Sequence, residues 1–398
     1  MSGKAEAMAE IDRLLRAAVA AGEVPGVVAV AADRSGAIYE GAFGRRSCDG
    51  DAAMTRDTIF RIFSMTKAIT CTAAMQLVEQ GRLALDAPVP DIGEPVLNTP
   101  QVLTGFDAAG KPLLHPAARP MTLRQLMTHT AGFTYEFWNA DTARYVETGG
   151  APSVLTGKLD AYRRPLNFDP GARWEYGINI DWVGRIIEAV SGQPLDAYLR
   201  EHVLSPLGMA DTGFALTPAQ QARQATLHQR QADGSLVPQM QPRAQPEFFA
   251  GGGGLYSTGP DYLRFLQMLL HDGSLGGARI LKPETVSLMH QNHIRDMPAG
   301  VLKSAMPALT DNVDFFPGAP LRWSLAHMLH LAPGPNGRSA GTLTWAGLAN
   351  LYYWLDPGRG ISGIIMTQIL PFADPAVLRL YGGFERGVYA LAAPDGAR

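Results

Sequence analysis

The chain has 398 residues, and 46% of them are hydrophobic, which is enough for one large core or for two subdomains. Its formal net charge of −3 argues against a nucleic-acid-binding surface and against an acidic disordered tail. The two cysteines, Cys48 and Cys71, lie in no C-x-x-C or Cys/His cluster, so we interpret them as free thiols and expect no metal site.

The first residues predict an amphipathic helix that ends near Gly22. Charged residues such as Glu10 and Arg13 interrupt the apolar run that a signal peptide requires. No stretch of the sequence approaches the ~18 consecutive apolar residues of a membrane span. We therefore expect a cytoplasmic protein without a membrane partner.

Two strands are expected next, because the apolar run Val27 to Ala32 is followed by a turn at Ser35-Gly36. From Ser64 onward the apolar residues recur at helical spacing, and Gly81 is a natural helix stop. The middle of the chain is also predicted to be helical. The helices expected there follow the capping box of Thr122 and Gln125, span residues 178–190, lie between Pro194 and Pro206, and run from Asp261 to His271.

Past residue 320 the chain is rich in β-branched and aromatic residues, with a turn signal at Pro357 to Gly360. A closing helix is expected after residue 374, interrupted at Gly382-Gly383. Strands at both ends and helices between them indicate an α+β fold, in which N- and C-terminal strands form one antiparallel sheet. We expect an α/β subdomain of residues 1–63 plus 255–398 and a helical subdomain of residues 64–254.

Two serines fit patterns that present a nucleophile, and chance alone predicts about 0.2 matches for each pattern. Ser339 lies in Gly337-Arg338-Ser339-Ala340-Gly341, a G-x-S-x-G sequence that needs a strand before it, a helix after it and a later histidine. A loop precedes Ser339, a strand-like run follows it, and the last histidine is His330. We interpret this pentapeptide as a glycine-rich turn.

Ser64 begins an S-x-x-K sequence that ends at Lys67. The site lies at the start of a predicted helix, where unpaired N–H groups and the helix dipole favour negative charge. A spacing of three residues places both side chains on one face of the helix. A lysine in a dry pocket can accept or relay the serine proton, so Ser64 is the better candidate nucleophile.

The sequence around Ser64 resembles the serine β-lactamase and D,D-peptidase superfamily, and most closely the class C-like branch that contains the family VIII carboxylesterases. The likeness spans roughly residues 60 to 350. The stretches that carry it, in the expected order, are Phe63-Ser64-Met65-Thr66-Lys67, Leu126-Met127-Thr128-His129-Thr130-Ala131-Gly132-Phe133, Trp174-Glu175-Tyr176, Pro206-Leu207-Gly208-Met209 and Gly253-Gly254-Leu255-Tyr256-Ser257-Thr258.

The resemblance implies a serine β-lactamase-like fold, in which Ser64 is the acylated nucleophile and Lys67 its activating partner. Tyr176 matches the tyrosine that shuttles the proton, so we expect it to hydrogen-bond Lys67 or to titrate together with it. The backbone N–H groups of Ser64 and Leu348 are expected to form the oxyanion hole. His129 is expected to bind backbone at a helix end rather than to act as a base.

Two departures from the β-lactamase pattern bear on substrate. Where β-lactamases carry K-T-G, this chain has Trp345-Ala346-Gly347, as family VIII esterases have a tryptophan variant, and Gly347 lets substrate approach the backbone. The asparagine expected two residues after the tyrosine is Ile178. Both changes predict inefficient β-lactam hydrolysis. The residues expected to line a substrate pocket are Trp345, Gly347 and Tyr135, with the aromatic side chains Phe137, Trp138, Phe248 and Phe249.

The sequence therefore predicts a serine carboxylesterase that hydrolyses small or short-chain acyl esters, without metal or cofactor, through an acyl-enzyme on Ser64. Three alternatives use the same Ser-Lys-Tyr site: a β-lactamase or D,D-peptidase, a small-amide hydrolase, and an acyltransferase. A non-catalytic binding protein is disfavoured, because Ser64, Lys67 and Tyr176 are all present.

Overall fold

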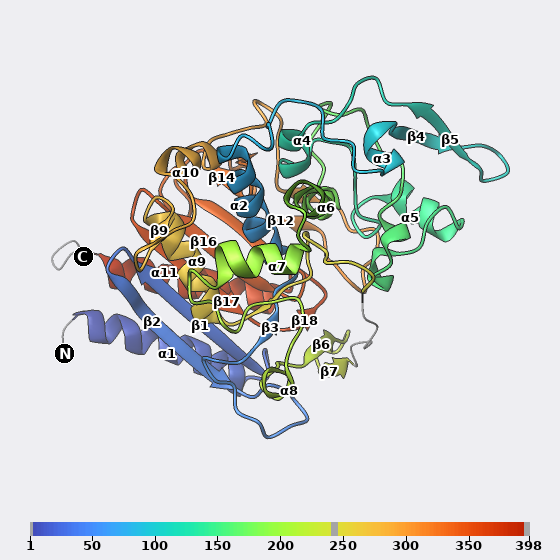
Figure 1. Cartoon of the computed structure of the whole chain (residues 1–398). Helices are drawn as coiled ribbons and strands as arrows, with labels where there is room; N and C mark the ends of the chain where they lie inside the picture. The colour runs from blue at the N-terminus through green and yellow to red at the C-terminus, as the bar shows by residue number, and fades with distance from the viewer. Residues whose placement is uncertain (1–2, 240–245, 394–398) are drawn as a thin grey trace.

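The central sheet is antiparallel and joins the two ends of the chain, as the sequence predicts. The computed structural model describes residues 3–239 and 246–393. Seven strands lie in the order β13-β14-β15-β16-β17-β1-β2 (Figure 1). Their bounds are β13 Leu321–Trp323, β14 Met328–His330, β15 Leu343–Gly347, β16 Leu351–Asp356, β17 Ile361–Met366, β1 Gly26–Asp33 and β2 Gly36–Gly44. The pairing of β1 with β17, Val28 opposite Met366, closes N-terminal onto C-terminal sequence.

The strands at the centre of the sheet are buried on both faces. Every residue of β16 and β17 is buried, so these strands read as continuous apolar runs rather than as alternating ones. Helix α9 (Gly259–Leu270) packs on β1, β16 and β17, and Gly259 lies directly against Val28 and Val30. Helices α1 (Gly3–Ala20) and α11 (Pro375–Ala392) pack on each other and on the strands (Figure 1).

Helix α11 runs without a break through Gly382-Gly383, which corrects the interruption expected from the sequence. The glycines allow a close approach to α1. A Cβ on Gly383 would lie 2.7 Å from Leu14 Cδ2, and one on Gly387 would lie 2.5 Å from Ile11 Cγ1. Packing against α1 therefore outweighs the cost of about 1 kcal/mol that each glycine carries in a helix.

The helices that position the site come from the middle of the chain. Helix α2 (Thr66–Glu79) packs against α6 (Asn179–Ser191), which also contacts α4 (Leu123–Met127) and α7 (Leu195–Leu199). The expected capping box of Thr122 and Gln125 starts α4, and Gly192 ends α6 in the left-handed region at φ 77°. The division into two subdomains stays a prediction.

The remaining elements are short. A hairpin of β4 (Gln101–Phe106) and β5 (Pro112–Pro116) projects from the body (Figure 1). The other strands are β3 Phe60–Arg61, β6 Leu227–Arg230, β7 Leu236–Gln239, β8 Tyr256–Ser257, β9 Ser274–Leu275, β10 Ala278–Arg279, β11 Val301–Leu302, β12 Val313–Asp314 and β18 Ile369–Leu370. The other helices are α3 Pro95–Asn98, α5 Ala140–Glu147, α8 Pro218–Gln221, α10 Pro283–Met289, the 3₁₀ turns η1 Phe63–Met65, η2 Val154–Thr156 and η3 Leu159–Ala161, and the π-helical η4 Arg200–Leu204. Among the described helices, none combines the length and the apolar character needed to cross a bilayer.

Candidate active site

Ser64 lies in the 3₁₀ turn η1, directly before α2. The residue before it, Phe63, has φ 45°, a left-handed conformation that is uncommon for a non-glycine residue. Neighbouring segments hold this turn: the N–H of Ile62 donates to Leu255 O at 3.0 Å, and the hydroxyl of Tyr262 donates to Met65 O at 2.9 Å. Such over-determined strain gathers at functional sites, and here it fixes where the Ser64 hydroxyl projects.

Lys67 is fully buried and uses all three hydrogens of its ammonium group. Its Nζ donates to Ser64 Oγ at 3.2 Å, to the Tyr135 hydroxyl at 3.1 Å and to Gly252 O at 2.7 Å. The carbonyl of Gly252 can only accept, so that bond anchors the amine in either charge state. The other two partners are hydroxyl groups, so those bonds can reverse direction, and a neutral Lys67 can accept the Ser64 proton.

Two tyrosines flank the amine. Tyr176 lies with its ring 4.8 Å from Lys67 Nζ, but its hydroxyl accepts from Trp345 Nε1 at 3.1 Å. The hydroxyl that Lys67 reaches is that of Tyr135, which the sequence suggests only as a pocket residue. Burial raises the pKa of Tyr135 well above its usual value, so Tyr135 stays protonated. The structure thus brings the ring of Tyr176 beside Lys67, whereas the hydrogen bond from the amine goes to Tyr135.

The end of β15 packs against the turn that contains Ser64. The turn η1 packs against β15, and a Cβ on Gly347 would lie 2.5 Å from Ile62 O. Only glycine permits this approach, which carries the following residue, Leu348, toward Ser64. Trp345 is buried on the same strand, with its ring 4.8 Å from that of Tyr176. The strand that carries a lysine in the K-T-G pattern therefore carries the aromatic side chain of Trp345 here.

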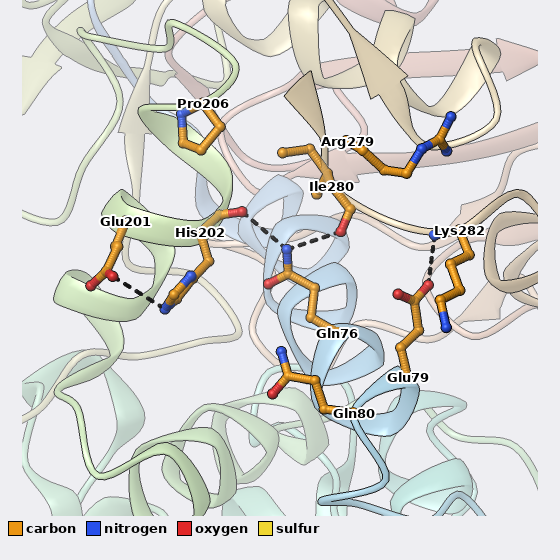
Figure 2. A pocket seen from close by; sticks show the side chains of 9 residues that line it. All are labelled: Gln76, Glu79, Gln80, Glu201, His202, Pro206, Arg279, Ile280 and Lys282. Atoms are coloured by element: carbon orange, nitrogen blue, oxygen red, sulfur yellow. Dashed lines mark hydrogen bonds and ion pairs between the residues drawn. The ribbon is translucent and has the colours of Figure 1, made fainter. Parts of the chain in front are cut away.

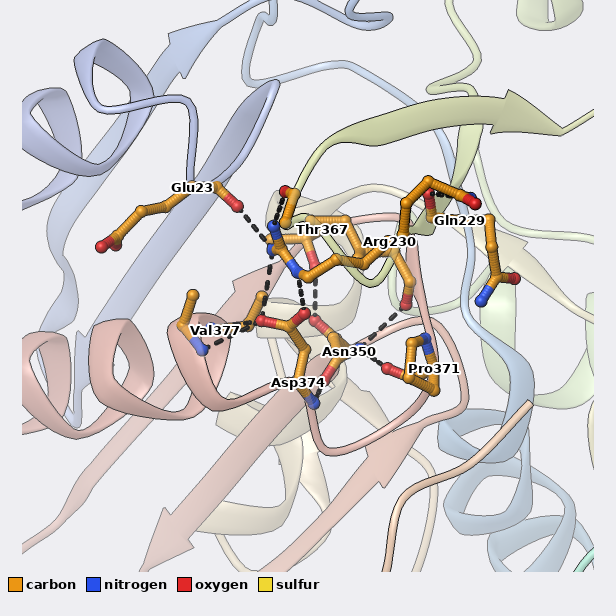
Figure 3. Close-up of polar contacts among 12 residues, drawn as sticks. Glu23, Gln229, Arg230, Asn350, Thr367, Pro371, Asp374 and Val377 are labelled. Atoms are coloured by element: carbon orange, nitrogen blue, oxygen red, sulfur yellow. Dashed lines mark hydrogen bonds and ion pairs between the residues drawn. The ribbon is translucent and has the colours of Figure 1, made fainter. Parts of the chain in front are cut away.

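A buried polar cluster fixes the tight turn that contains Leu348 (Figure 3). Asn350 is fully buried at φ 60°, and its amide nitrogen donates to Ile369 O and Pro371 O, both at 2.8 Å. Its amide oxygen accepts from the N–H of Asp374 at 3.0 Å, and the carboxylate of Asp374 pairs with Arg230. The β15–β16 turn is therefore held by segments far along the chain.

His129 follows α4 and is not placed to act as a base. Its Nδ1 faces the N–H of Gly177 at 3.4 Å and the amide of Asn179 at 3.1 Å, and its own carbonyl accepts from the N–H of Glu175 at 3.0 Å. Burial, with Lys67 nearby, holds the pKa of His129 well below its usual value. The expected role at a helix end is confirmed, and this neutral imidazole positions the segment that carries Tyr176.

Ser339 is a turn residue, as the sequence indicates. Its N–H donates to Asp356 Oδ2 at 2.8 Å, and its hydroxyl is bound to the same carboxylate. The hydroxyl of Tyr389 donates to Asp356 Oδ2 at 2.8 Å as well. Arg338, beside it, forms a fully buried ion pair with Glu385. These contacts fix the loop that leads into β15.

The expected aromatic residues fall into two groups. Phe137 stacks on Tyr135 with ring centroids 4.6 Å apart, and Trp138 follows it, so both extend the tyrosine wall of the site. Phe248 packs instead on Tyr162 at 4.8 Å, and Phe249 packs on Phe214 at 5.1 Å. The second group lies just before the glycine run of residues 251–254.

Asp181, for which no sequence pattern predicts a function, is buried in the first turn of α6. Its Oδ1 accepts from the N–H of Gly252 at 2.9 Å, and the carbonyl of the same residue holds Lys67. The spacing of 71 residues between Asp181 and Gly252 gives no pattern in the sequence. Only the fold links this carboxylate to the amine, through the N–H and the carbonyl of a single residue.

A surface hollow of about 410 Å³ lies at the other end of α2 (Figure 2). Gln76 spans it, with its amide nitrogen donating to His202 O and Ile280 O, both at 3.0 Å. Its lining carries both signs of charge. The lining residues are Gln76, Glu79, Gln80, Glu201, His202, Pro206, Arg279, Ile280 and Lys282. Nine residues of helix separate Gln76 from Lys67, about 13 Å, so this hollow is not part of the serine site.

Comparison with known proteins places these features in a family. The profile described as Beta-lactamase matches residues 11–385. Monacolin J acid methylbutanoyltransferase from Aspergillus terreus is 33% identical over 400 residues, covering 96% of this chain and 95% of that protein. Lovastatin esterase from Penicillium rubens is 31% identical over 397 residues, covering 95% and 98%.

Solved structures agree with the sequence matches. A mutant of simvastatin synthase from Aspergillus terreus superposes with a TM-score of 0.84 at 31% identity, over 98% of this chain and 96% of that one. The predicted β-lactamase-like fold is therefore confirmed, and so is the expectation of an enzyme that acts through a serine.

Proposed function

Because the chain belongs to the β-lactamase family, we propose that it is an acyltransferase, which carries a small acyl group on Ser64 and passes it to a hydroxyl group of a small-molecule acceptor. The observation that carries the proposal is the 3.2 Å contact between the Nζ of the buried Lys67 and the Oγ of the partly exposed Ser64. Water can replace the acceptor, in which case the same site hydrolyses the ester.

In the first half-reaction, Ser64 Oγ attacks the acyl carbonyl and forms a C–O bond. The serine proton passes to Lys67, whose fixed bond to Gly252 keeps Nζ within reach of Oγ. The N–H groups of Ser64 and Leu348 are proposed to stabilise the oxyanion. The bond to the leaving group then breaks, and that group departs with a proton supplied through Tyr176.

The second half-reaction reverses these steps with a new alcohol. The acceptor hydroxyl gives its proton to the Tyr176/Lys67 pair while its oxygen attacks the acyl-enzyme carbonyl. The ester bond to Ser64 breaks, and Ser64 Oγ recovers a proton from Lys67. Hydrolysis follows the same path with water, so the two activities differ only in which nucleophile occupies the site.

Two observations support acyl transfer over the short-chain ester hydrolysis predicted from the sequence. The relative from Aspergillus terreus is by its name a transferase of a methylbutanoyl group, and it aligns along nearly the whole chain. The side chains packed around Tyr135 and Tyr176 are also aromatic and buried, namely Phe137 and Trp345, and such surroundings favour an apolar acceptor over water. Ester hydrolysis remains the second candidate, because lovastatin esterase aligns equally well.

The wall formed by β15 argues against β-lactams as the main substrates. The K-T-G lysine, which helps to hold the substrate carboxylate in the β-lactamase pattern, is replaced by Trp345, and its indole N–H is already donated to Tyr176. An anionic β-lactam therefore lacks its usual partner on this strand. We expect nitrocefin to be turned over far more slowly than activated esters.

The test is to supply p-nitrophenyl butyrate with and without an apolar alcohol and to measure both nitrophenol and the new ester. We expect the alcohol to divert acyl groups into ester product. Ser64→Ala should reduce both products to the uncatalysed rate. Ser339→Ala is the matched control and should keep most of the activity, because its hydroxyl only binds Asp356.

If no alcohol yields ester product while hydrolysis by the wild-type enzyme continues, the transferase proposal is wrong and the esterase candidate replaces it. If Ser64→Ala keeps turnover, neither function resides at this serine.

A further inference from the structure

We propose that Asp181 is a positioning residue for the serine site, which acts through the backbone of Gly252 to hold Lys67 and to supply its counter-charge. This inference rests on the proposed function, because it assumes that Lys67 activates Ser64. Neither the motif of the nucleophile nor the tyrosines of the site require an acidic residue on α6.

The geometry is a chain of three groups. Asp181 Oδ1 accepts from the N–H of Gly252 at 2.9 Å, and the O of Gly252 accepts from Lys67 Nζ at 2.7 Å. Both bonds are buried, so each is stronger than it would be in water. Both groups belong to Gly252, so the bond from Asp181 holds this residue, and with it the carbonyl that binds Lys67, in place.

Gly252 is required by this arrangement. A Cβ at that position would lie 2.3 Å from Asp181 Oδ2 and 2.9 Å from Oδ1, so any side chain would push the carboxylate away. Next to it, Thr70 Oγ1 donates to Gly251 O at 2.8 Å and fixes the loop to α2. The loop is therefore hydrogen-bonded on one side to α2, which follows Ser64, and on the other side to α6, which carries Asp181.

Asp181 is not explained as a structural residue alone. It is 2% exposed, and among the described residues its Oδ2 accepts no close hydrogen bond, although the hydroxyl of Tyr135 lies near enough to act to lower its pKa. Burying a carboxylate in which only one oxygen accepts a close hydrogen bond costs free energy, unless a nearby cation compensates its charge. In this pocket the compensating cation is the ammonium group of Lys67, and the Coulomb attraction of Lys67 acts to lower the pKa of Asp181.

The ionisation of Asp181 supports the same picture. Burial raises the pKa of Asp181 to about 6, against the opposing effects of Lys67 and the Gly252 N–H. The carboxyl is therefore ionised at neutral pH and becomes protonated as the pH falls through 6. Besides Lys67, the titratable groups that face this carboxyl or the amine are Tyr135, Tyr162, Tyr176, His129 and Cys71, with the Arg164–Glu136 ion pair beyond them.

Four of these other groups do not gain or lose charge near pH 6. Burial raises the pKa values of Tyr135, Tyr162 and Cys71 and lowers that of His129, so all four stay neutral there. An inflection at that pH therefore reports on Asp181.

The experiment measures the rate at which a fluorophosphonate probe labels Ser64 in the full-length enzyme, as a function of pH. For the wild type we expect the labelling rate to fall as the pH drops through about 6. In Asp181→Asn this inflection should vanish.

Asp261→Asn is the matched control. Asp261 also lies in the first turn of a helix, its pKa is also raised by burial, and its Oδ2 accepts from the N–H of Asp211 and the hydroxyl of Thr212. Within residues 3–239 and 246–393, no hydrogen bond joins Asp261 to Ser64, Lys67 or Gly252. Its pH profile should match that of the wild type.

If Asp181→Asn labels slowly but keeps the inflection near pH 6, Asp181 is only structural and the inference is overturned. If that variant does not fold, Gly252→Ala tests the same link, because the added methyl displaces the carboxylate while keeping its charge. Slower labelling with the inflection near pH 6 shifted is then expected, and a wild-type profile overturns the inference. Persistent labelling of Ser64→Ala would instead refute the proposed function.

Discussion

At the scale of the residue, the site is organised around one amine. Lys67 binds a nucleophile, a phenol and a carbonyl at once, and only the carbonyl bond is fixed in direction. The two hydroxyl bonds can therefore carry the proton while Gly252 keeps the amine in place. Ser64 and Lys67 are local in sequence, which explains why their pairing can be predicted from a spacing of three.

The tyrosines make a prediction at this scale. Tyr176→Phe should lower kcat by about 10²–10⁴-fold, because it removes the proposed proton carrier, with little change in KM. Tyr135→Phe should have a smaller effect, since Gly252 still anchors Lys67. Steady-state kinetics with p-nitrophenyl butyrate measure both.

Tyr198→Phe provides the control for that comparison. Tyr198 is buried beside His202, at the far end of α2 from Ser64, and should be replaced without loss of activity. A Tyr176→Phe enzyme as active as this control would remove Tyr176 from the mechanism.

At the scale of the element, the sequence predicted which segments are helices and strands better than it predicted their packing. The interruption expected at Gly382-Gly383 was wrong because glycine weakens a helix locally, whereas here it permits contact with α1. The links from Asp181 to Gly252 and from Asn350 to Ile369, Pro371 and Asp374 are likewise tertiary. No local pattern encodes them, because buried polar groups find partners only once the fold has formed.

The α1–α11 contact can be tested by stability. Gly387→Ala places a methyl 2.5 Å from Ile11 Cγ1 and should lower the free energy of unfolding by about 1–3 kcal/mol through overpacking. At Gly382 the nearest atom to a Cβ is Asn336 Nδ2 at 3.4 Å, so Gly382→Ala should be neutral or stabilise the helix by about 1 kcal/mol. Chemical denaturation distinguishes the two, and equal effects would mean that close packing does not explain the continuous helix.

At the scale of the whole molecule, the fold brings together three distant parts of the chain. The pairing of β1 with β17 completes the sheet, β15 presents Gly347 to the segment before Ser64, and α6 brings Asp181 to the loop at Gly252. The order of motifs was enough to predict the family and the antiparallel sheet. The preferred acyl acceptor was not predictable, because the same Ser-Lys-Tyr group serves transfer and hydrolysis.

The most direct test of the central claim is to find the residue that carries the acyl group. The enzyme is mixed with p-nitrophenyl butyrate, quenched in acid within one turnover, digested and analysed by mass spectrometry. We predict a butyryl group on the peptide that contains Ser64, and its loss when an acceptor alcohol is added before the quench. A butyryl group on any other residue, or undiminished turnover by Ser64→Ala, would contradict the claim.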